Sequence, residues 1–206
     1  VSLGFSFVPN FVSLYDEGVG DEGLYSELTP PKSSGERWVG VAPFAKHKGK
    51  IYPLDRMEKV VSKLSEESRV KIFLFGSGDR ERKILSLWRE RYPGVISLAD
   101  KRYGFAVELS LMSRLDVMIS MDSANMHLAS LVAVPGVSVW GATHPYCGFL
   151  GWRQSDSGVV ELPLDCRPCS VFGNKPCYRK DYACLEIAPE TIVDRVKSLE
   201  TLIKEK

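Results

Sequence analysis

Short apolar runs rich in β-branched residues recur along the chain, and they predict the buried strands of a sheet. Five runs of this kind cover residues 38–42, 70–75, 95–98, 117–120 and 137–140. A strand that is covered on both faces need not alternate apolar with polar residues, so continuous runs favour a parallel sheet.

Segments with a helical period lie between these runs and after them. Their apolar stripes consist of Leu54, Met57, Val61 and Leu64; of Ile84, Leu85 and Trp88; and of Leu109, Met112 and Leu115. The last helix begins at Pro189, a favourable first-turn residue, and one face of it carries Ile192, Val196, Leu199 and Ile203. Strands that alternate with helices of this length predict βαβ units. The expected fold is therefore α/β, a Rossmann-like parallel sheet with helices on both faces.

The chain divides into an irregular leading segment and a regular remainder. Residues 1–36 hold many turn formers and no sustained period, so we expect a leader or an inter-domain connection with one short element. Residues 37–206 are expected to form one domain, which includes a cysteine-rich loop at 166–184 and the C-terminal helix at 189–205. The first residue is Val1 rather than Met, so we expect the chain to be a piece of a longer protein.

The balance of charge argues against one class of partner. The 206 residues include 27 basic and 26 acidic side chains, a net charge of +1, whereas nucleic-acid binders usually carry a basic excess. No apolar run reaches the length of a membrane span, and the first residues lack the basic region and cleavage site of a secretory signal. We therefore expect a cytoplasmic protein with no nucleic-acid partner.

The loops that follow the strands are the candidates for chemistry, because parallel sheets bind ligands at the carboxyl ends of their strands. Lys46, His47, Lys48 and Lys50 follow the first strand and form a compact cationic loop that leads into a helix. Amines beside a helix N-terminus suit a phosphate group. A solvated lysine-rich loop is the alternative.

The second strand ends in a glycine-containing turn. Gly76 and Gly78 would let the backbone approach a ligand, and Asp79 is a suitable helix cap. The spacing matches neither the dinucleotide fingerprint nor a P-loop. A plain strand-to-helix turn explains this segment equally well.

The loop after the fourth strand carries the most informative residues, which run from Asp122 to His127. Asp122 or Ser123 could cap the helix that follows. Alternatively, Ser123 and the neighbouring N–H groups could hold a diphosphate at the positive end of the helix dipole. His127 lies within the first turn of that helix, on the expected ligand side.

Two further loops hold reactive or polar side chains. Thr143 and His144 follow the fifth strand, where either turn chemistry or a ligand contact would explain them. The loop at 166–184 holds four thiols, which could ligate one zinc ion, form disulfides or stay reduced. These thiols belong to Cys166, Cys169, Cys177 and Cys184.

Taken in order, these segments resemble the C-terminal domain of the heptosyltransferase family, whose members have the GT-B architecture. The resemblance runs from about residue 37 to the end, and its motifs are Lys50-x-Tyr52-Pro53, Asp122-Ser123-x-x-Met126-His127-Leu128-Ala129 and Gly141-x-Thr143-x-Pro145. Two positions depart from the family pattern. Ala124 stands where many members have glycine, and only Gly78 and Asp79 lie where many members place an acidic residue near the ribose.

The resemblance implies transfer of a heptose, or a related sugar, from a nucleotide diphosphate donor such as ADP-heptose to a lipopolysaccharide core. The residues that it assigns to the donor are Lys50, Asp122, Ser123, Ala124 and His127. We expect Lys46, Gly76 and Thr143, which lie in the loops after the strands, to bind the donor as well. The acceptor-binding site and the general base are expected in an N-terminal domain outside this chain. The full-length enzyme could associate peripherally with the inner membrane.

The chemistry of such a transfer suits these residues. Negative charge builds up on the leaving diphosphate, and lysines together with a helix N-terminus can neutralise it. The sequence holds no Asp-x-Asp motif, so we expect a mechanism without a metal or another cofactor. The resemblance implies that the transfer is inverting. Two alternatives remain at this point: another GT-B sugar-nucleotide enzyme, such as an epimerase or an N-acetylglucosaminyl transferase, and a non-catalytic nucleotide-binding module.

Overall fold

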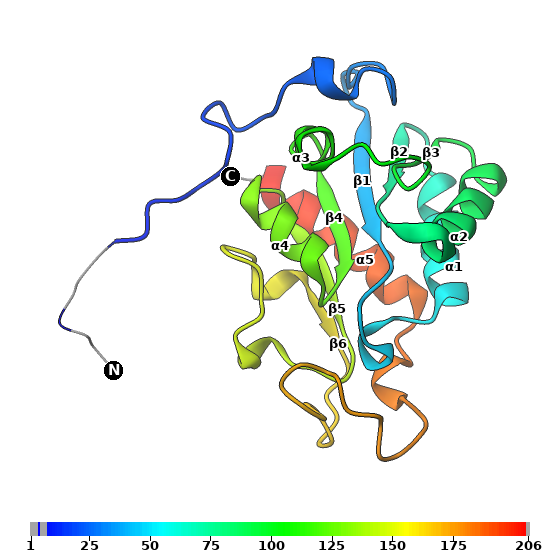
Figure 1. The fold of residues 1–206 in the computed structure, drawn as a ribbon, viewed down its shortest axis with the longest axis vertical. Coiled ribbons are helices and arrows are strands. Elements are labelled where there is room, and N and C mark those ends of the chain that lie inside the picture. Colours follow the sequence, from blue (N-terminus) through cyan, green and yellow to red (C-terminus); the bar gives the residue numbers. More distant parts are fainter. Residues whose placement is uncertain (1–3, 5–7, 205–206) are drawn as a thin grey trace.

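The computed structural model describes residue 4 and residues 8–204, with the side chains of 200–204 left aside. Its centre is one sheet of six parallel strands in the order β3-β2-β1-β4-β5-β6 (Figure 1). The strands are β1 (Arg37–Ala42), β2 (Val70–Leu74), β3 (Val95–Ser97), β4 (Val117–Met121), β5 (Gly136–Trp140) and β6 (Val159–Glu161). The strand order reverses between β1 and β4, because β2 and β3 are added on one side of β1 and β4 to β6 on the other. Such sheets usually bind ligands at this switch point.

Helices cover both faces of the sheet, so the expected α/β parallel architecture is confirmed. The five α-helices are α1 (Leu54–Ser65), α2 (Gly78–Arg91), α3 (Phe105–Met112), α4 (Ala124–Leu131) and α5 (Pro189–Lys204). The first, second and fifth share one core with the sheet, and the third and fourth share the other.

The two cores contain the apolar stripes that the sequence predicts. On α1, Met57, Val61 and Leu64 are fully buried beside Val60, while Leu54 lies at the margin. Each such side chain contributes roughly 1.5–3 kcal/mol relative to an exposed position. On α5, Ile192, Val196 and Leu199 are buried against the sheet. The Ile203 side chain and residue 205 of the expected helix lie outside the described residues.

Two elements differ from the expectation. The third helix ends at Met112, so Leu115 lies in the turn that follows, although it stays buried in the same core. The turn forms there because the Ser113 hydroxyl donates to the Ser110 carbonyl and accepts from the Gly20 N–H group. Strand β6 has no counterpart among the expected strands. It is three residues long, with only Val160 buried, which is too short for an apolar run to reveal.

Residues 14–36 pack along the face that α3 and α4 cover, whereas residues 8–12 are exposed. A short 3-10 helix, η1 (Glu22–Tyr25), places the Tyr25 ring edge-on to Trp38, with 6.2 Å between the ring centroids. The Leu14 N–H group donates to the Leu131 carbonyl at 2.8 Å. This segment therefore contributes a buried aromatic ring to the core of the domain. Positions 1–3 and 5–7 of the expected leader lie outside the described residues.

None of the described helices combines the length and the apolar composition that a membrane span needs.

Candidate functional site

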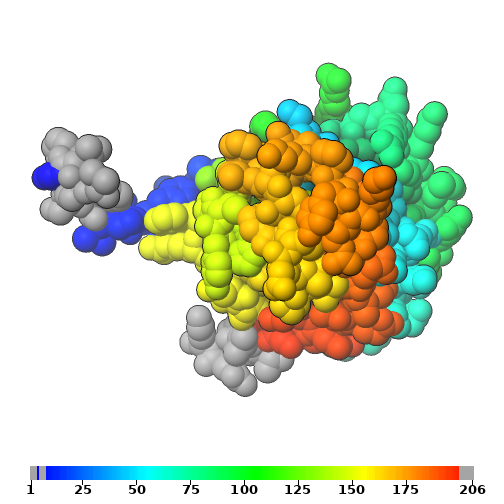
Figure 2. Space-filling model, turned by 90° about the horizontal axis from the view of Figure 1, so that it is seen from below, coloured from blue at the N-terminus to red at the C-terminus, as the bar shows by residue number. Residues whose placement is uncertain are grey.

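The carboxyl ends of the strands lie at one end of the molecule, where three strand-end loops meet the cysteine-rich loop at 166–184. The loop after β1 contains the 3-10 helix η2 (Lys48–Lys50), and α4 begins directly after β4. Figure 2 looks onto this end, and residues 166–184, in yellow to orange, cover the centre of the surface. The site is therefore built from segments that are far apart in the sequence.

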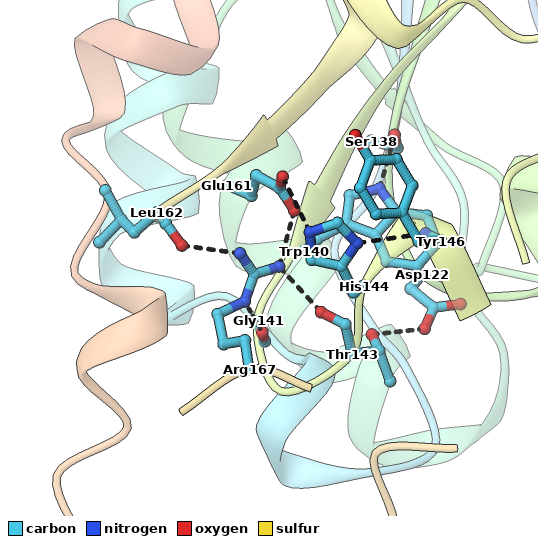
Figure 3. A network of polar contacts seen from close by, with 10 residues as sticks. All are labelled: Asp122, Ser138, Trp140, Gly141, Thr143, His144, Tyr146, Glu161, Leu162 and Arg167. Carbon is cyan, nitrogen blue, oxygen red and sulfur yellow. Dashed lines mark hydrogen bonds and ion pairs between the residues drawn. The ribbon is translucent and has the colours of Figure 1, made fainter. Parts of the chain in front are cut away.

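Lys50, Asp122 and Thr143 form a buried polar cluster at this end. The Thr143 hydroxyl donates to Asp122 Oδ2 at 2.7 Å (Figure 3). The Lys50 Nζ lies 2.9 Å from the same oxygen. The side chains of Lys50 and Asp122 are only 15% and 5% exposed. The three residues come from the loops after β1, β4 and β5, and all three are among the expected donor-binding residues.

The backbone around Lys50 explains why this lysine turns inward. Gly49 is buried, and its carbonyl accepts a hydrogen bond from the Ala142 N–H group at 2.8 Å. Two residues later, the buried Tyr52 hydroxyl donates to the Ile187 carbonyl at 2.7 Å, and burial raises the pKa of this phenol to about 12. These contacts fix the loop on both sides of Lys50, so the Lys50 and Tyr52 positions of the motif are explained by packing.

The start of α4 presents free polar groups beside this cluster. Ser123 is the N-cap residue, yet its hydroxyl makes no capping bond, and Ser123 Oγ is buried without a hydrogen-bond partner in the described part of the chain. Asp122 makes no cap either, because its carboxylate binds Lys50 and Thr143. The capping interpretation is therefore wrong for both residues. The Met126 N–H group donates to the Ser123 carbonyl at 3.2 Å, whereas the Ala124 and Asn125 N–H groups have no partner within the helix and can face an anion.

The remaining expected donor residues lie around this cluster on exposed or half-buried positions. Ala124 and His127 are exposed in the first turn of α4, and Lys46 is exposed in the loop after β1. Lys48 lies two residues after Lys46, and its Nζ lies over the Tyr182 ring, 5.0 Å from the ring centroid. Only Lys50 of the cationic loop therefore reaches the buried cluster.

The turn after β2 is closed by a hydrogen bond from its backbone to an acidic side chain of α2. Gly76 lies against Leu85 and Glu81, and Glu81 Oε2 accepts from the Ser77 N–H group at 2.8 Å. The expected cap at Asp79 is wrong: Ser77 is the N-cap residue, and Asp79 forms an exposed ion pair with Arg82. Glu81 is therefore the acidic side chain that closes this turn.

Sequence reasoning missed Arg167 and Glu161, which lie directly behind the cluster. The Arg167 side chain is 2% exposed, and its guanidinium donates to the Thr143 carbonyl at 2.8 Å and to Glu161 Oε2 at 2.8 Å (Figure 3). No motif marks this arginine, which stands in an irregular loop between two cysteines. Glu161 closes the short strand that the apolar pattern did not reveal.

The cysteines of the loop at 166–184 are all free thiols in the structure. Burial raises the pKa of the Cys184 thiol to about 11, and the neighbouring thiols of Cys169, Cys177 and Cys166 add to this rise. Burial also raises the pKa of Cys169. Within the described residues, no three His, Cys, Asp or Glu side chains gather in a way that could hold a metal ion. The zinc and disulfide alternatives for this loop stay predictions.

Comparison with known proteins places this site in a family. The sequence model of glycosyltransferase family 9 (heptosyltransferase) matches residues 21–177, most of the chain. The chain belongs to glycosyltransferase family 9. Lipooligosaccharide heptosyltransferase 2 of Campylobacter jejuni is 24% identical to this family 9 chain over 172 residues, which are 82% of the chain and 53% of that relative.

Solved structures show the same fold. The structure of E. coli ADP-heptose LPS heptosyltransferase II matches the family 9 chain with a TM-score of 0.66 at 20% identity, over 90% of this chain and 53% of that one. E. coli heptosyltransferase WaaC with ADP-2-deoxy-2-fluoro heptose matches with a TM-score of 0.62 at 17% identity, over 96% and 52% of the two chains. The Rossmann-like domain of a GT-B glycosyltransferase, expected from the sequence, is thereby confirmed. This family 9 chain spans about half the length of the relatives that it matches.

Proposed function

We propose that the chain is the donor-binding half of a glycosyltransferase that transfers a heptose, or a related sugar, from a nucleotide diphosphate to a lipopolysaccharide core. The observation that carries the proposal is the pairing of two anion-binding features at one place. The buried Lys50 ammonium lies 2.9 Å from Asp122, directly before the start of α4, where Ser123 Oγ has no partner among the described residues. Family membership and the sugar nucleotide in the WaaC structure support this proposal.

These residues could stabilise the leaving diphosphate without a metal. Negative charge develops on the diphosphate as the sugar–phosphate bond breaks, and fixed positive groups stabilise that charge best when they are already in place. Lys50 supplies an ammonium group that is paired with Asp122, and the start of α4 supplies the positive end of the helix dipole. Asp122 holds the ammonium in position beforehand. Lys46, Gly76, Ala124, His127 and Thr143 complete the proposed donor site.

The rest of the reaction is assigned to residues outside this chain. An inverting displacement needs a general base that removes the proton from the acceptor hydroxyl. We place this base, and the contact with the acceptor, in an N-terminal domain that precedes the present chain. In this proposal residues 1–36 act as a leader or inter-domain connection, residues 37–206 bind the donor, and the full-length enzyme acts at the cytoplasmic side of the inner membrane.

Calorimetric titration of the chain with ADP, UDP and GDP tests the proposal. We expect one of the three to bind, and we expect it to be ADP. In a thermal melt the bound nucleotide should raise the melting temperature, because a ligand at about 100 times its Kd adds roughly 2.7 kcal/mol to the free energy of unfolding. Lys50→Gln should weaken binding at least about tenfold, since a charged hydrogen bond to phosphate contributes about 1.5–3 kcal/mol.

A matched control separates this effect from a general loss of charge. Lys59→Gln removes an exposed lysine from the middle of α1 and should leave the affinity unchanged. If none of the three nucleotides binds the wild-type chain, the proposed function is wrong. If Lys50→Gln and Lys59→Gln bind alike, the assignment of Lys50 is wrong.

A further inference from the structure

Arg167 makes an unusually complete set of contacts for a residue in an irregular loop. Its Nε donates to the Gly141 carbonyl at 2.5 Å, and its Nη1 donates to the Leu162 carbonyl at 2.7 Å. Its Nη2 donates both to the Thr143 carbonyl and to Glu161 Oε2, each at 2.8 Å. Figure 3 shows the guanidinium between these acceptors. A planar guanidinium has the fixed, divergent donors that such a set of acceptors requires, and an ammonium does not.

Two of the three carbonyls that Arg167 binds, those of Gly141 and Thr143, belong to the strand-end loop that carries Thr143. The same three-residue stretch is also held from two other sides, because the Ala142 N–H group donates to the Gly49 carbonyl and the Cys169 N–H group donates to the Ala142 carbonyl, both at 2.8 Å. The Thr143 side chain is fully buried and its hydroxyl is aimed at Asp122. The position of this hydroxyl therefore depends on where Arg167 holds the backbone.

The charge of Arg167 is balanced on the side away from the Lys50 cluster. Glu161 Oε2 pairs with the guanidinium, and Glu161 Oε1 lies 3.5 Å from the His144 Nε2. The His144 Nδ1 accepts a hydrogen bond from the Tyr146 N–H group at 3.2 Å, so Nε2 is the nitrogen that carries the proton and faces the carboxylate. Arg167 is buried and Glu161 is partly exposed, so removal of Glu161 leaves a buried guanidinium without its counter-charge.

We propose that Arg167 is a positioning residue of the donor site, which acts through Thr143 and Asp122 on the Lys50 ammonium. This inference rests on the proposed function for its effect on ligands. The connection runs from the guanidinium to the Thr143 carbonyl, from the Thr143 hydroxyl to Asp122 Oδ2, and from that oxygen to Lys50 Nζ. The cysteine-rich loop thus holds this guanidinium beneath the site.

The test compares two ligands of the same nucleoside, its diphosphate and its monophosphate, on the wild-type chain and on Arg167→Gln. Because Lys50 is assigned to the diphosphate, we expect affinity for the diphosphate to fall about tenfold, as for the loss of a charged hydrogen bond. Affinity for the monophosphate should change less than about twofold. Equal weakening of both ligands would show a general structural defect, and no weakening of either would show that Arg167 has no role, so either result overturns the proposal.

Milder variants keep the test informative if Arg167→Gln does not fold. Glu161→Gln removes the counter-charge from a half-exposed position and should shift the ratio of the two affinities in the same direction by a smaller factor. Arg167→Lys should not restore the ratio, because an ammonium cannot reach the divergent carbonyls. Arg153→Gln, at an exposed position, is the matched control and should leave the ratio unchanged. A wild-type ratio in Glu161→Gln, or a restored ratio in Arg167→Lys, would count against the proposal.

A second measurement needs no ligand and separates this inference from the proposed function. A double-mutant cycle combines Arg167→Gln with Thr143→Val, and the unfolding equilibrium constant is measured for each protein. Residues that act through one network are non-additive, so we expect a coupling of at least about fivefold in that constant. If the wild-type chain binds no nucleotide, the proposed function fails and the cycle alone decides. Additive effects in the cycle would overturn the connection from Arg167 through Thr143.

Discussion

Replacement of Asp122 by asparagine should destabilise the protein through Lys50. The two side chains have the same shape, and asparagine keeps an oxygen that can accept the 2.7 Å hydrogen bond from Thr143. The substitution removes the negative charge that lies 2.9 Å from Lys50 Nζ. The ammonium is then left without a counter-charge in a position where its side chain is only 15% exposed.

The magnitude follows from this burial. Removal of one partner from a buried ion pair costs about 3–5 kcal/mol, because the other charge stays buried and uncompensated. Some water reaches Lys50, so we take the lower end and expect the free energy of unfolding to fall by about 3 kcal/mol. For a domain of this size, each kcal/mol lowers the melting temperature by about 2–4 °C, which gives a decrease of about 6–12 °C.

Differential scanning calorimetry of the full chain measures this decrease. Asp165→Asn is the matched control, because it removes one negative charge from an exposed position and should change the free energy of unfolding by less than about 0.5 kcal/mol. The double variant Asp122→Asn/Lys50→Met should recover part of the loss, since it removes the stranded ammonium as well. The reasoning is refuted if Asp122→Asn melts within about 1 °C of the wild type.

Three further predictions concern other parts of the domain. Gly173→Ala should lower the free energy of unfolding by about 1–2 kcal/mol and should weaken diphosphate binding in a calorimetric titration: Gly173 has a φ of +66°, and an added Cβ would lie 2.8 Å from Lys50 Cδ. Unchanged affinity would contradict this. Burial raises the pKa of Glu108, so its ionised form disfavours folding above that raised pKa, and the penalty disappears below the unfolded value. Glu108→Gln should therefore raise the melting temperature at pH 7, and a gain that persists undiminished at pH 3 would argue against the cause. Finally, mass spectrometry should show that Cys184 reacts with iodoacetamide at pH 8 far more slowly in the folded chain than in denaturant, because burial raises the pKa of its thiol to about 11. Equal reaction rates in the two states would contradict that burial.

The order of strands and helices could be predicted from the sequence because each element repeats one simple pattern. The Met57, Val61 and Leu64 stripe and the apolar run of β4 depend on local burial, and local burial leaves a period in the sequence. The end of α3 could not be found in this way. Leu115 continues the helical spacing but is buried from a turn, because Ser113 bonds to a glycine far away in the sequence.

The candidate site was predictable only where a loop motif and a strand end coincide. Asp122 and Thr143 directly follow buried strands, so the topology brings them together even though the sequence separates them. The choice of Lys50 over Lys46 depends on the carbonyl of Gly49, which bonds to the next strand-end loop. Arg167 had no signal at all. Its role comes from four acceptors on two segments, residues 141–143 and residues 161–162, and no spacing in the sequence encodes their meeting.

The strand order also has a consequence for the synthesis of this protein on the ribosome. Within this domain, strands β1, β2 and β3 leave the ribosome before β4 and can pair with one another, but the other edge of β1 is completed only by β4, where Val39 meets Val117. Those partners are about 80 residues apart, so at usual rates of synthesis the edge stays open for roughly 4–16 seconds. An apolar strand with a free edge is a template for pairing with other chains. The nascent chain therefore exposes a strand edge that the finished fold covers.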